Sequence, residues 1–494
     1  MNFENNADRV RKRLLIETAK LTIENRLTSD IDRLPLKLFP KNKDGIRCCV
    51  HKDRAVTKNR LQAVLGHRIE EETDELKPLR DYAEETLERE TISGPMLTVV
   101  DEACSSCVKA RHFVTNACRG CVARPCLINC PKDAIQITES HAKIDEEKCV
   151  DCGICRKVCP YHAIVYIPVP CEDACPADAI TKDEYGREEI DYTKCVFCGK
   201  CMSACPFGAI MERSQIVDVL KHVLADDGPR VVAMLAPALA GQFPGEFEQV
   251  VAAVHQLGFD DVVEVAVGAK ITAQKEAMEI EERLAEGEPF MTTSCCPAYT
   301  ELVKKHVPDL KKFVSDTKTP MHYTAELVRK DDPNTITVFV GPCVAKRNEA
   351  LHDPYVNYVL TVEELGALFV AANIEIADCE AVKISDAGER NGRGFPVTGG
   401  VSGAVKNYLK DDSGIETVLV DGLDKKSIKV LSAYSKGKCP GNMVEVMSCE
   451  GGCVAGPCGI GKTAVVARRL KAFIAKNEAE DPQEKKAVST TVNG

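Results

Sequence analysis

The chain of 494 residues contains no tryptophan, and aromatic residues make up only 5% of it. Proteins that bind single-stranded nucleic acids stack bases on such side chains, so a platform of that kind is not expected. The net charge of −11 also disfavours a general nucleic-acid role, although it leaves room for a local basic patch that meets an acidic protein. We therefore expect no nucleic-acid partner.

Long apolar runs are missing as well. No window approaches the roughly 20 apolar residues that a membrane-spanning helix needs. The first residues, Met-Asn-Phe-Glu-Asn-Asn-Ala-Asp-Arg, lack the apolar region of a secretory signal. The sequence therefore predicts no membrane association.

Cysteine, in contrast, is abundant, with 26 residues. Such a number indicates either a disulfide scaffold in a secreted protein or thiolate ligands in an intracellular one. Most of these cysteines are separated by only two or three residues, which is too tight for ordinary cross-links. Metal ligation is the better interpretation, and the cytoplasm is the expected compartment.

Residues 1–95 are rich in charge and have a helical pattern, for example between Ala55 and Leu87. They predict a helical N-terminal domain whose role the sequence does not show. Cys48 and Cys49 are its only cysteines. A ligand or redox pair is one interpretation, but two buried or idle thiols is the simpler one.

Residues 96–215 contain four copies of Cys-Pro-x-x-Ala-Ile, which predicts duplicated structural units. The copies begin at Cys130, Cys159, Cys175 and Cys205. Two of them end complete runs of the form Cys-x2-Cys-x2-Cys-x3-Cys-Pro, the pattern of bacterial ferredoxins. The run that ends at Cys130 is a looser version. This region is expected to be a tandem ferredoxin-like domain of the α+β class.

In two-cluster ferredoxins the fourth cysteine of each run ligates the other cluster. The same rule predicts up to four [4Fe-4S] clusters here, which we call clusters A to D. Their predicted ligands are Cys118, Cys121, Cys126 and Cys159 for A; Cys149, Cys152, Cys155 and Cys130 for B; Cys104, Cys107, Cys171 and Cys205 for C; and Cys195, Cys198, Cys201 and Cys175 for D. Zinc stays an alternative for Cys104 and Cys107.

The pattern changes from about Gly228, where apolar runs alternate with helical stretches. Such alternation predicts an α/β domain over residues 228–475, with mostly parallel sheets flanked by helices in two lobes. The expected strands are Val231–Leu235, Val262–Val265, Thr335–Val340, Thr417–Val420 and Val444–Met447, and the expected helices include Glu248–His255 and Ala269–Leu284. Residues 476–494 are polar and predict a disordered tail.

Five cysteines of this domain lie in distinctive segments: Cys295, Cys296, Cys343, Cys449 and Cys453. A cubane cluster needs four thiolates, which leaves one thiol over. An adjacent pair can rarely ligate the same cluster, so one member of the Cys-Cys pair is available for another task, such as proton transfer. The segments follow apolar runs and lead into Pro or Gly, which predicts ligands at strand ends that face a crevice.

Together these segments resemble the active-site signatures of [FeFe]-hydrogenases, and the ferredoxin-type region fits the accessory domain of that family. The Cys-Glu-Gly-Gly-Cys and Gly-Pro-Cys-Val-Ala-Lys-Arg forms are similar to its group B branch. The resemblance implies an H-cluster, in which a [4Fe-4S] cluster is bridged to a two-iron centre with carbon monoxide, cyanide and azadithiolate. By motif position its ligands are Cys296, Cys343, Cys449 and Cys453, with Cys453 as the bridging thiolate.

The resemblance also implies roles for nearby residues. Cys295 matches the thiol that passes protons to the azadithiolate amine. Glu276, Glu279 and Arg283 match the proton-exit residues by spacing, and Ser315 matches the relay serine. Without the Cys-Cys pair, the two glutamates would be interpreted as a solvated helix face. Residues expected to contact the two-iron centre are Lys346, Met447, Ala236 and Pro237.

Some positions depart from the family pattern. The best-studied members have Met-Pro-Cys where this chain has Gly341-Pro342-Cys343, and a serine where Ala238 stands. They also have Gly-Gly-Gly-Gln-Pro in the segment around Cys458. These changes alter the walls of the site and remove no ligand.

The resemblance implies a ferredoxin-dependent iron hydrogenase that interconverts H2 with protons and electrons. Ferredoxin or a similar carrier and hydrogenase maturation proteins are the expected partners, and the [4Fe-4S] clusters relay the electrons. Three alternatives are a non-catalytic iron–sulfur assembly protein of related fold, an H2 sensor and a plain electron carrier. The last of these leaves the cysteines of the α/β domain unexplained.

The segment from Gly456 to Thr463 formally satisfies the phosphate-loop pattern. That motif requires a strand directly before it, whereas the preceding residues form the Cys-Glu-Gly-Gly-Cys turn. Nucleotide binding is therefore not predicted. Five cysteines remain without a proposed ligand role, and ordinary packing is expected for them: Cys48, Cys49, Cys379, Cys439 and Cys458.

Overall fold

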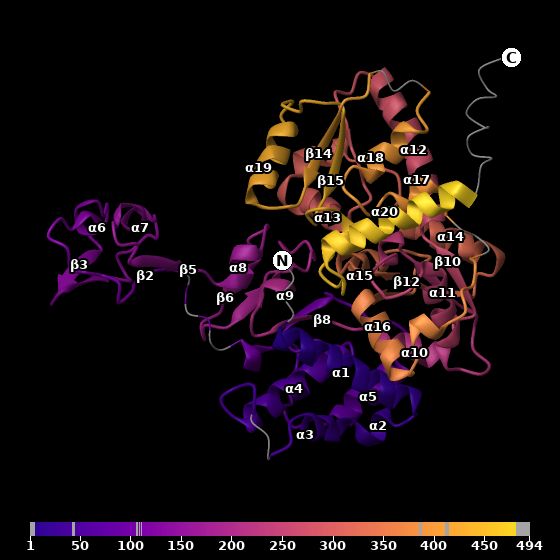
Figure 1. Cartoon of the computed structure of the whole chain (residues 1–494), viewed down its shortest axis with the longest axis horizontal. Helices are drawn as coiled ribbons and strands as arrows, with labels where there is room; N and C mark the ends of the chain where they lie inside the picture. Colours follow the sequence, from indigo (N-terminus) through magenta and orange to yellow (C-terminus); the bar gives the residue numbers. More distant parts are fainter. Residues whose placement is uncertain are drawn as a thin grey trace.

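The computed structural model describes residues 5–41, 45–104, 107, 109, 111–384, 388–410 and 414–480. None of the helices in these ranges combines the length and apolarity needed to cross a membrane. The chain begins with a group of helices, continues through two ferredoxin-like modules and ends in an α/β domain (Figure 1).

The N-terminal domain is helical, as the pattern predicts. Its elements are α1 (Asn6–Ile23), α2 (Leu27–Asp30), η1 (Ile31–Arg33), α3 (Leu34–Leu38), α4 (Val50–Val64) and α5 (Leu79–Glu88). The pattern between Ala55 and Leu87 is divided between α4 and α5. Gly66 has a φ of +83° after α4, and Pro78 precedes α5. Both features interrupt a helix, because a left-handed residue and a proline cannot continue it.

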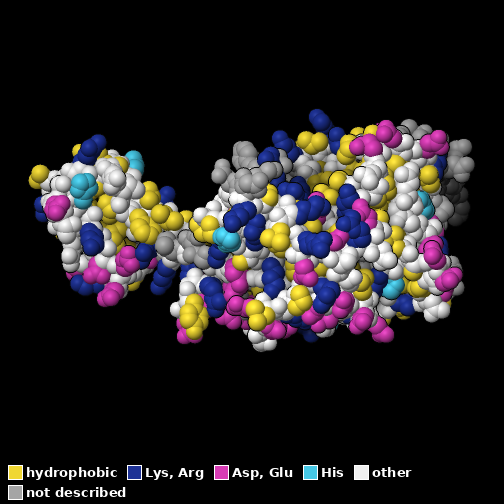
Figure 2. Space-filling view, turned by 90° about the horizontal axis from the view of Figure 1, so that it is seen from below, with side chains coloured by type: hydrophobic (Ala, Val, Ile, Leu, Met, Phe, Trp, Pro, Cys, Tyr) yellow, Lys and Arg dark blue, Asp and Glu magenta, His cyan; other side chains and the backbone are white. Residues whose placement is uncertain are grey.

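The outer ferredoxin module comprises residues 111–167 and extends away from the rest of the chain (Figure 1). Its elements are β2 (Arg111–Val114), α6 (Pro125–Ile128), β3 (Ile135–Thr138), β4 (His141–Ile144), α7 (Ile154–Val158) and β5 (Ile164–Ile167). Strand β2 pairs antiparallel with β5, and β3 with β4. Figure 2 shows this module as a separate lobe with exposed basic and apolar side chains.

The inner ferredoxin module repeats the arrangement against the body of the protein. Its elements are β1 (Leu97–Val99), η2 (Asp101–Ala103), α8 (Pro170–Ala174), β6 (Ile180–Lys182), β7 (Glu188–Ile190), α9 (Lys200–Ala204) and β8 (Ile210–Glu212). Strand β1 pairs antiparallel with β8, and β6 with β7. Helix α10 (Ile216–Val223) then leads into the α/β domain.

The α/β domain contains two sheets of parallel strands, which confirms the predicted fold class. The first has the order β10 (Asp261–Glu264), β9 (Val231–Leu235), β12 (Ile336–Gly341) and β13 (Tyr358–Thr361). The second has the order β11 (Met291–Thr292), β15 (Met443–Met447) and β14 (Thr417–Asp421). Strands β9, β12 and β15 are buried along their whole length, as expected of continuous apolar runs inside a parallel sheet.

Helices cover both sheets. They are η3 (Pro237–Leu239), α11 (Phe247–Gln256), α12 (Ala266–Ala285), α13 (Pro297–His306), η4 (Pro308–Phe313), α14 (Pro320–Asp331), α15 (Ala345–Ala350), α16 (Val362–Ala371), η5 (Ile376–Asp378), α17 (Arg390–Arg393), α18 (Gly400–Lys406), α19 (Lys425–Tyr434), η6 (Cys453–Ala455) and α20 (Thr463–Glu480). Helix α20 ends at Glu480, and its apolar side chains Val466 and Leu470 are buried. It overlaps the first five residues of the tail predicted for 476–494, and residues 481–494 lie outside the described residues.

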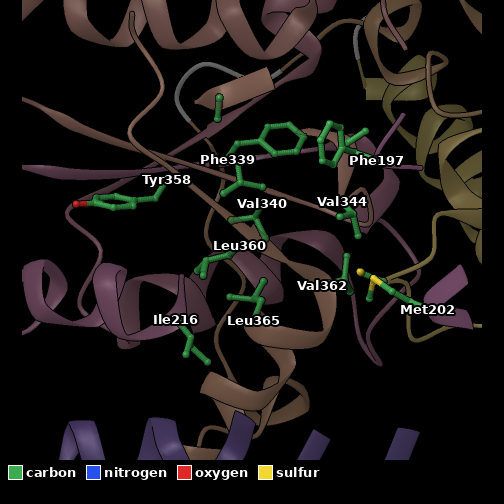
Figure 3. Close-up of a cluster of buried hydrophobic side chains, with 14 of the residues drawn as sticks. Phe197, Met202, Ile216, Phe339, Val340, Val344, Tyr358, Leu360, Val362 and Leu365 are labelled. Carbon is green, nitrogen blue, oxygen red and sulfur yellow. The ribbon is translucent and has the colours of Figure 1, made fainter. Parts of the chain in front are cut away.

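One hydrophobic core connects the inner ferredoxin module to the first sheet (Figure 3). Phe197 and Met202 of the module belong to the same cluster as Val340 of β12 and Leu360 of β13. Burial of apolar side chains of this size stabilises an interface by about 1.5–3 kcal/mol each. The inner module is therefore fixed in position relative to the α/β domain.

Candidate functional site

The five distinctive cysteines lie at the ends of strands or at the starts of helices. Cys295 and Cys296 come between β11 and α13, and Cys343 comes between β12 and α15. Cys449 follows β15, and Cys453 begins η6. Within each of the two sheets the parallel strands end at the same edge, and the loops at these edges carry the cysteines, as is usual for ligand sites of α/β proteins.

All five cysteines line a single cavity of about 100 Å³. Its walls are apolar apart from the thiols, Lys346 and Ser448. Four other residues predicted to lie beside the two-iron centre, Ala236, Pro237, Lys346 and Met447, line the same cavity. The structure thus brings together residues that are up to 217 positions apart, between Ala236 and Cys453.

Burial raises the pKa of each of the four thiols proposed as ligands, to about 11 for Cys343 and about 12 for Cys453. Neighbouring thiols raise the pKa values of Cys343, Cys449 and Cys453 further, while backbone N–H groups at the start of α13 and α15 lower those of Cys296 and Cys343. Free thiolates are disfavoured in such a place, whereas iron supplies the positive charge that makes four thiolates stable together.

The donor set fits a cubane cluster. No group of three or more His, Cys, Asp or Glu side chains in the described part of the chain converges on one point where a single metal ion would lie. A cubane instead presents separate iron corners, each of which takes one thiolate. Four thiols around an apolar cavity satisfy that requirement, and Cys295 is the thiol left over.

Lys346 is buried beside the thiols and forms an ion pair with Glu349, at 2.7 Å between Nζ and Oε2. Burial lowers the pKa of Lys346, but Glu349 and the thiols of Cys343 and Cys295 outweigh that effect, so its pKa lies above the ordinary value. The ammonium group is therefore charged within the cavity wall. Sequence reasoning missed Glu349, although its i,i+3 spacing from Lys346 on α15 is typical of a helix ion pair.

Glu276 of α12 is fully buried, so the interpretation as a solvated helix face is wrong for this residue. Its Oε1 accepts hydrogen bonds from the backbone N–H of Ser294 at 3.1 Å and from Ser294 Oγ at 3.3 Å. Burial raises the pKa of Glu276 to about 7. Because Ser294 directly precedes Cys295, the carboxyl group lies next to the spare thiol, whose pKa is raised by burial and by Glu276.

Glu279, one helical turn further along α12, accepts four hydrogen bonds or ion pairs. Ser315 Oγ and Thr317 Oγ1 donate to its Oε2 at 2.5 and 2.9 Å, and the backbone N–H of Asp316 donates to its Oε1 at 2.9 Å. Arg283 Nη2 lies 2.6 Å from Oε1. Burial raises the pKa of Glu279, but these donors more than offset it, so the pKa is lower than usual.

These polar groups form a series that begins at the cavity. Cys295 is followed by Glu276 with Ser294, and then by Glu279 with Ser315 and Arg283. Asp316 is exposed at the outer end and lies 3.2 Å from Arg283 Nη2. An open cleft lined by Ser294, Ser315 and Thr317 reaches the same place. Sequence reasoning missed Ser294 and Thr317, because a single hydroxyl residue carries no recognisable pattern.

The predicted ligand sets of clusters A and B lie together in the outer module. Burial raises the pKa of Cys126, and the neighbouring thiols of Cys159 and Cys121 raise it further. Cys130, Cys149, Cys152 and Cys155 line one small cavity with His112 and Asp151. Cys152 is exposed, which places set B at the surface of the protein.

The sets of clusters C and D lie together in the inner module. Burial raises the pKa of Cys171, and Cys205 and Cys104 raise it further. Burial likewise raises the pKa of Cys195 to about 12, with Cys198 and Cys175 as neighbours. Cys198 also lines the main cavity, so set D borders the five-cysteine site.

The remaining cysteines and the phosphate-loop pattern have separate explanations. Cys48 and Cys49 are exposed, so ordinary packing is wrong for them and idle thiols remain the simpler interpretation, while Cys379 and Cys458 are buried and Cys439 is half-buried. The segment before α20 follows η6 rather than a strand. Its backbone N–H groups at Ile460 and Gly461 donate to Gln242 Oε1 at 3.1 and 2.8 Å, so a side chain already occupies the amides that would hold a phosphate.

Comparison with sequence families gives matches in both halves of the chain. The family described as "Iron only hydrogenase large subunit, C-terminal domain" matches residues 229–457. A "4Fe-4S binding domain" matches residues 142–165, and an "LdpA Fe-S cluster-binding domain" matches residues 165–216. The first match contains the five cysteines of the cavity, and the other two contain most ligands of clusters B and D.

Curated relatives agree with these matches. "Iron hydrogenase 1" of Clostridium pasteurianum is 28% identical over 389 residues, which cover 66% of this chain and 66% of that protein. "Periplasmic [Fe] hydrogenase large subunit" of Nitratidesulfovibrio vulgaris is 30% identical over 374 residues, which cover 64% of this chain and 85% of that protein. A "Cytosolic Fe-S cluster assembly factor" of Kluyveromyces lactis is 26% identical over 117 residues, or 23% of this chain.

Proposed function

The chain belongs to the family of iron-only hydrogenase large subunits, and from this premise we propose that it interconverts H2 with protons and electrons at the five-cysteine cavity. Ferredoxin or a similar one-electron carrier is the proposed redox partner. The proposed reaction is reversible.

The observation that carries this proposal is the gathering of five cysteines around one apolar cavity. Four of them suffice for a cubane. The fifth, Cys295, has as its neighbour Glu276, which does not line the cavity. A plain electron carrier needs neither a spare thiol nor a buried carboxyl group beside it.

In the proposed holoenzyme, Cys296, Cys343, Cys449 and Cys453 hold the H-cluster, with Cys453 as the thiolate shared with the two-iron centre. When bound, this group would supply the redox and acid–base chemistry that splits or forms H2. Lys346 would place a positive charge beside it. Ala236, Pro237 and Met447 form apolar walls that exclude water and fix the position of the centre.

Proton transfer is assigned to the series of polar groups that begins at Cys295. Its Sγ would hold a proton next to the cofactor and exchange it with Glu276, whose pKa of about 7 suits both uptake and release near neutral pH. Ser315 and Glu279 share a hydrogen bond of 2.5 Å further out. The hydrogen bonds from Ser315, Asp316 and Thr317, together with Arg283, keep Glu279 ionised at the surface end.

Electron transfer is assigned to the ferredoxin-type modules. Set D borders the cavity, and set C shares the inner module with it, while sets A and B occupy the outer module. The exposed Cys152 places set B within reach of a carrier at the surface. We further propose that the protein acts in the cytoplasm and depends on hydrogenase maturation proteins for its two-iron centre.

Two other functions are compatible with this fold. An iron–sulfur assembly protein related to hydrogenases would need no proton-transfer thiol, and the buried Cys295–Glu276 neighbours count against it. An H2 sensor would keep the cofactor but turn over slowly.

The test uses the full chain produced together with hydrogenase maturation proteins. Infrared bands of bound carbon monoxide and cyanide are expected, together with H2 evolution from reduced ferredoxin. Cys295→Ser should keep the infrared bands and lose most turnover. Cys379→Ser is the matched control, because Cys379 is buried but does not line the cavity. Absent infrared bands would favour the assembly protein, and bands without turnover would favour the sensor.

A further inference from the structure

Arg60 of the N-terminal helix α4 reaches into the inner ferredoxin module. Its Nη2 donates to the carbonyl oxygens of Phe207 at 2.8 Å and Gly208 at 2.7 Å. Both carbonyls belong to the loop that follows Cys205, a predicted ligand of cluster C. Figure 1 shows α4 among the N-terminal helices, on the side of the molecule where β8 lies.

The peptide group between Gly208 and Ala209 connects the guanidinium to the sulfur atom. Its carbonyl oxygen accepts from Arg60, and its N–H donates to Cys205 Sγ at 3.4 Å. A positive charge at the oxygen polarises the peptide and strengthens the donor at the other end. Arg60 therefore acts on the sulfur atom of Cys205 through one peptide group.

The same N–H to sulfur bond recurs in every copy of Cys-Pro-x-x-Ala-Ile. Ala134, Ala163 and Ala179 donate to Cys130, Cys159 and Cys175 at 3.3, 3.4 and 3.3 Å. The residue before each alanine has a positive φ in all four copies, from +47° to +57°. The copies thus share one backbone conformation, and their differences reveal what is particular to the Cys205 loop.

Glycine is found at this left-handed position in the Cys205 loop alone, whereas the other copies have Asp133, His162 and Asp178. A Cβ atom on Gly208 would lie 2.4 Å from Arg60 Nη2 and 3.1 Å from Ala7 Cβ. Within the described residues, the matching carbonyls of the other copies have no guanidinium donor. The glycine therefore makes room for the N-terminal domain at this loop.

The charge of Arg60 has no matching carboxylate. Arg60 is only 2% exposed. In the described part of the chain, no Asp or Glu oxygen lies within 4.0 Å of its guanidinium group. The nearby Asp53 is engaged by Arg47 at 3.1 Å. Burial lowers the pKa of Arg60 to about 10, with Arg47 and Arg11 acting in the same direction and Cys205 and Asp53 in the opposite one. The group is still protonated near neutral pH.

A buried cation requires a compensating negative charge, since burial of an unpaired charge is costly. A [4Fe-4S] cluster with four thiolate ligands carries net negative charge, and its charge becomes more negative by one on reduction. The cluster at Cys205 would supply the counter-charge that the protein side chains around Arg60 do not.

We propose that Arg60 is a positioning residue that raises the reduction potential of cluster C through the Gly208–Ala209 peptide. The inference rests on the proposed cofactor set and not on H2 turnover. Hydrogen bonds to cluster sulfurs and nearby charge set the potential of iron–sulfur centres. A fixed positive charge stabilises the reduced, more negative state. The N-terminal domain, which none of the family matches covers, thereby gains a role in the electron path.

The test is a redox titration of the holoprotein, followed by electron paramagnetic resonance of the reduced clusters. Arg60→Gln is expected to lower the ratio of reduced to oxidised cluster C about tenfold at a fixed potential, a shift of about 59 mV for a one-electron couple. The other clusters should keep their potentials. Iron content is measured in parallel.

Arg213→Gln is the matched control. Arg213 is also buried, at 7% exposed, and donates to the backbone carbonyls of Gly66, Ser93 and Pro95, away from any cluster loop. Arg213→Gln should leave the reduction potentials of all clusters unchanged, even where it lowers the stability of the protein.

Gly208→Ala provides a second variant should Arg60→Gln fail to retain its iron. The added Cβ displaces the guanidinium from the carbonyl, so a shift in the same direction is expected. Unchanged potentials in every loaded variant would overturn the proposal. Because the readout needs clusters and not hydrogenase activity, its failure is distinguishable from failure of the proposed function.

Discussion

Glu276 and Ser294 are joined by two hydrogen bonds to the same carboxylate oxygen, one from the backbone N–H at 3.1 Å and one from Oγ at 3.3 Å. Both residues are buried, and Ser294 is bonded covalently to Cys295. The second carboxylate oxygen of Glu276 is buried and has no hydrogen-bond partner among the residues that the structure describes. That oxygen is available to exchange a proton with a neighbour.

Glu276→Gln should lower the rate of H2 evolution by about 10²–10⁴-fold, the usual contribution of a positioned acid–base group. The amide can keep its acceptor oxygen towards Ser294 but cannot take up and release a proton. Rates are measured with reduced methyl viologen, which bypasses the natural carrier. Infrared bands of the cofactor should be unchanged. A variant that evolves H2 at the native rate would remove Glu276 from the proton path.

Ser315 and Thr317 offer a matched pair, because both hydroxyls donate to Glu279 Oε2. Ser315→Ala should slow turnover about ten- to hundredfold, as expected when a bond to a charged group worth about 1.5–3 kcal/mol is lost from the path. Thr317→Val removes a similar donor and should slow turnover much less. Equal losses in the two variants would mean that the hydroxyls only hold Glu279 in place.

Sequence patterns predicted the parallel strands well because each is a continuous apolar run, as in Val231–Leu235. They did not single out β11, since Met291–Thr292 is too short to form a pattern, nor β13, the short strand Tyr358–Thr361. The cavity cysteines could be predicted because their neighbours Pro and Gly are unusual. The contact of Arg60 with Gly208 could not, because 148 positions separate the two residues and a lone arginine in a charged helix gives no signal.

An ion pair between Arg11 of α1 and Glu363 of α16, at 2.9 Å, connects the N-terminal helices to the α/β domain. Their side chains are 11% and 4% exposed. Arg11→Met should lower the free energy of unfolding by about 3–5 kcal/mol, because it leaves a buried carboxylate without its partner. Urea unfolding followed by circular dichroism measures the change.

The double variant Arg11→Met with Glu363→Gln should recover much of that loss, because no buried charge is left unpaired. Lys37→Met is the control. Lys37 pairs with Glu17 at 2.7 Å but is 58% exposed, so its removal should cost less than about 1 kcal/mol. A double variant as unstable as Arg11→Met alone would mean that packing of the arginine stem, rather than charge, holds the two domains together.

His67 makes the stability of the N-terminal domain depend on pH. Burial lowers the pKa of His67 to about 4 from an ordinary value of 6.5, so the folded protein holds the neutral ring. Its Nε2 lies 3.0 Å from both the Tyr82 carbonyl oxygen and Thr86 Oγ1. The unfolded chain binds a proton below pH 6.5 while the folded one does not. Stability from this residue is therefore complete above pH 6.5 and is lost as the pH falls towards 4.

The loss between pH 7.5 and pH 5 should be about 2 kcal/mol, which follows from proton binding by the unfolded state alone. His67→Gln, which cannot titrate, should show a smaller dependence over the same interval when urea midpoints at the two pH values are compared. The carboxylates contribute equally to the pH dependence of stability in both proteins. The difference between the pH dependences of the native protein and of His67→Gln therefore gives the contribution of the histidine. Identical slopes would show that the His67 ring is protonated in the folded state, for which Glu85, at 3.8 Å from Nδ1, is the nearby acceptor.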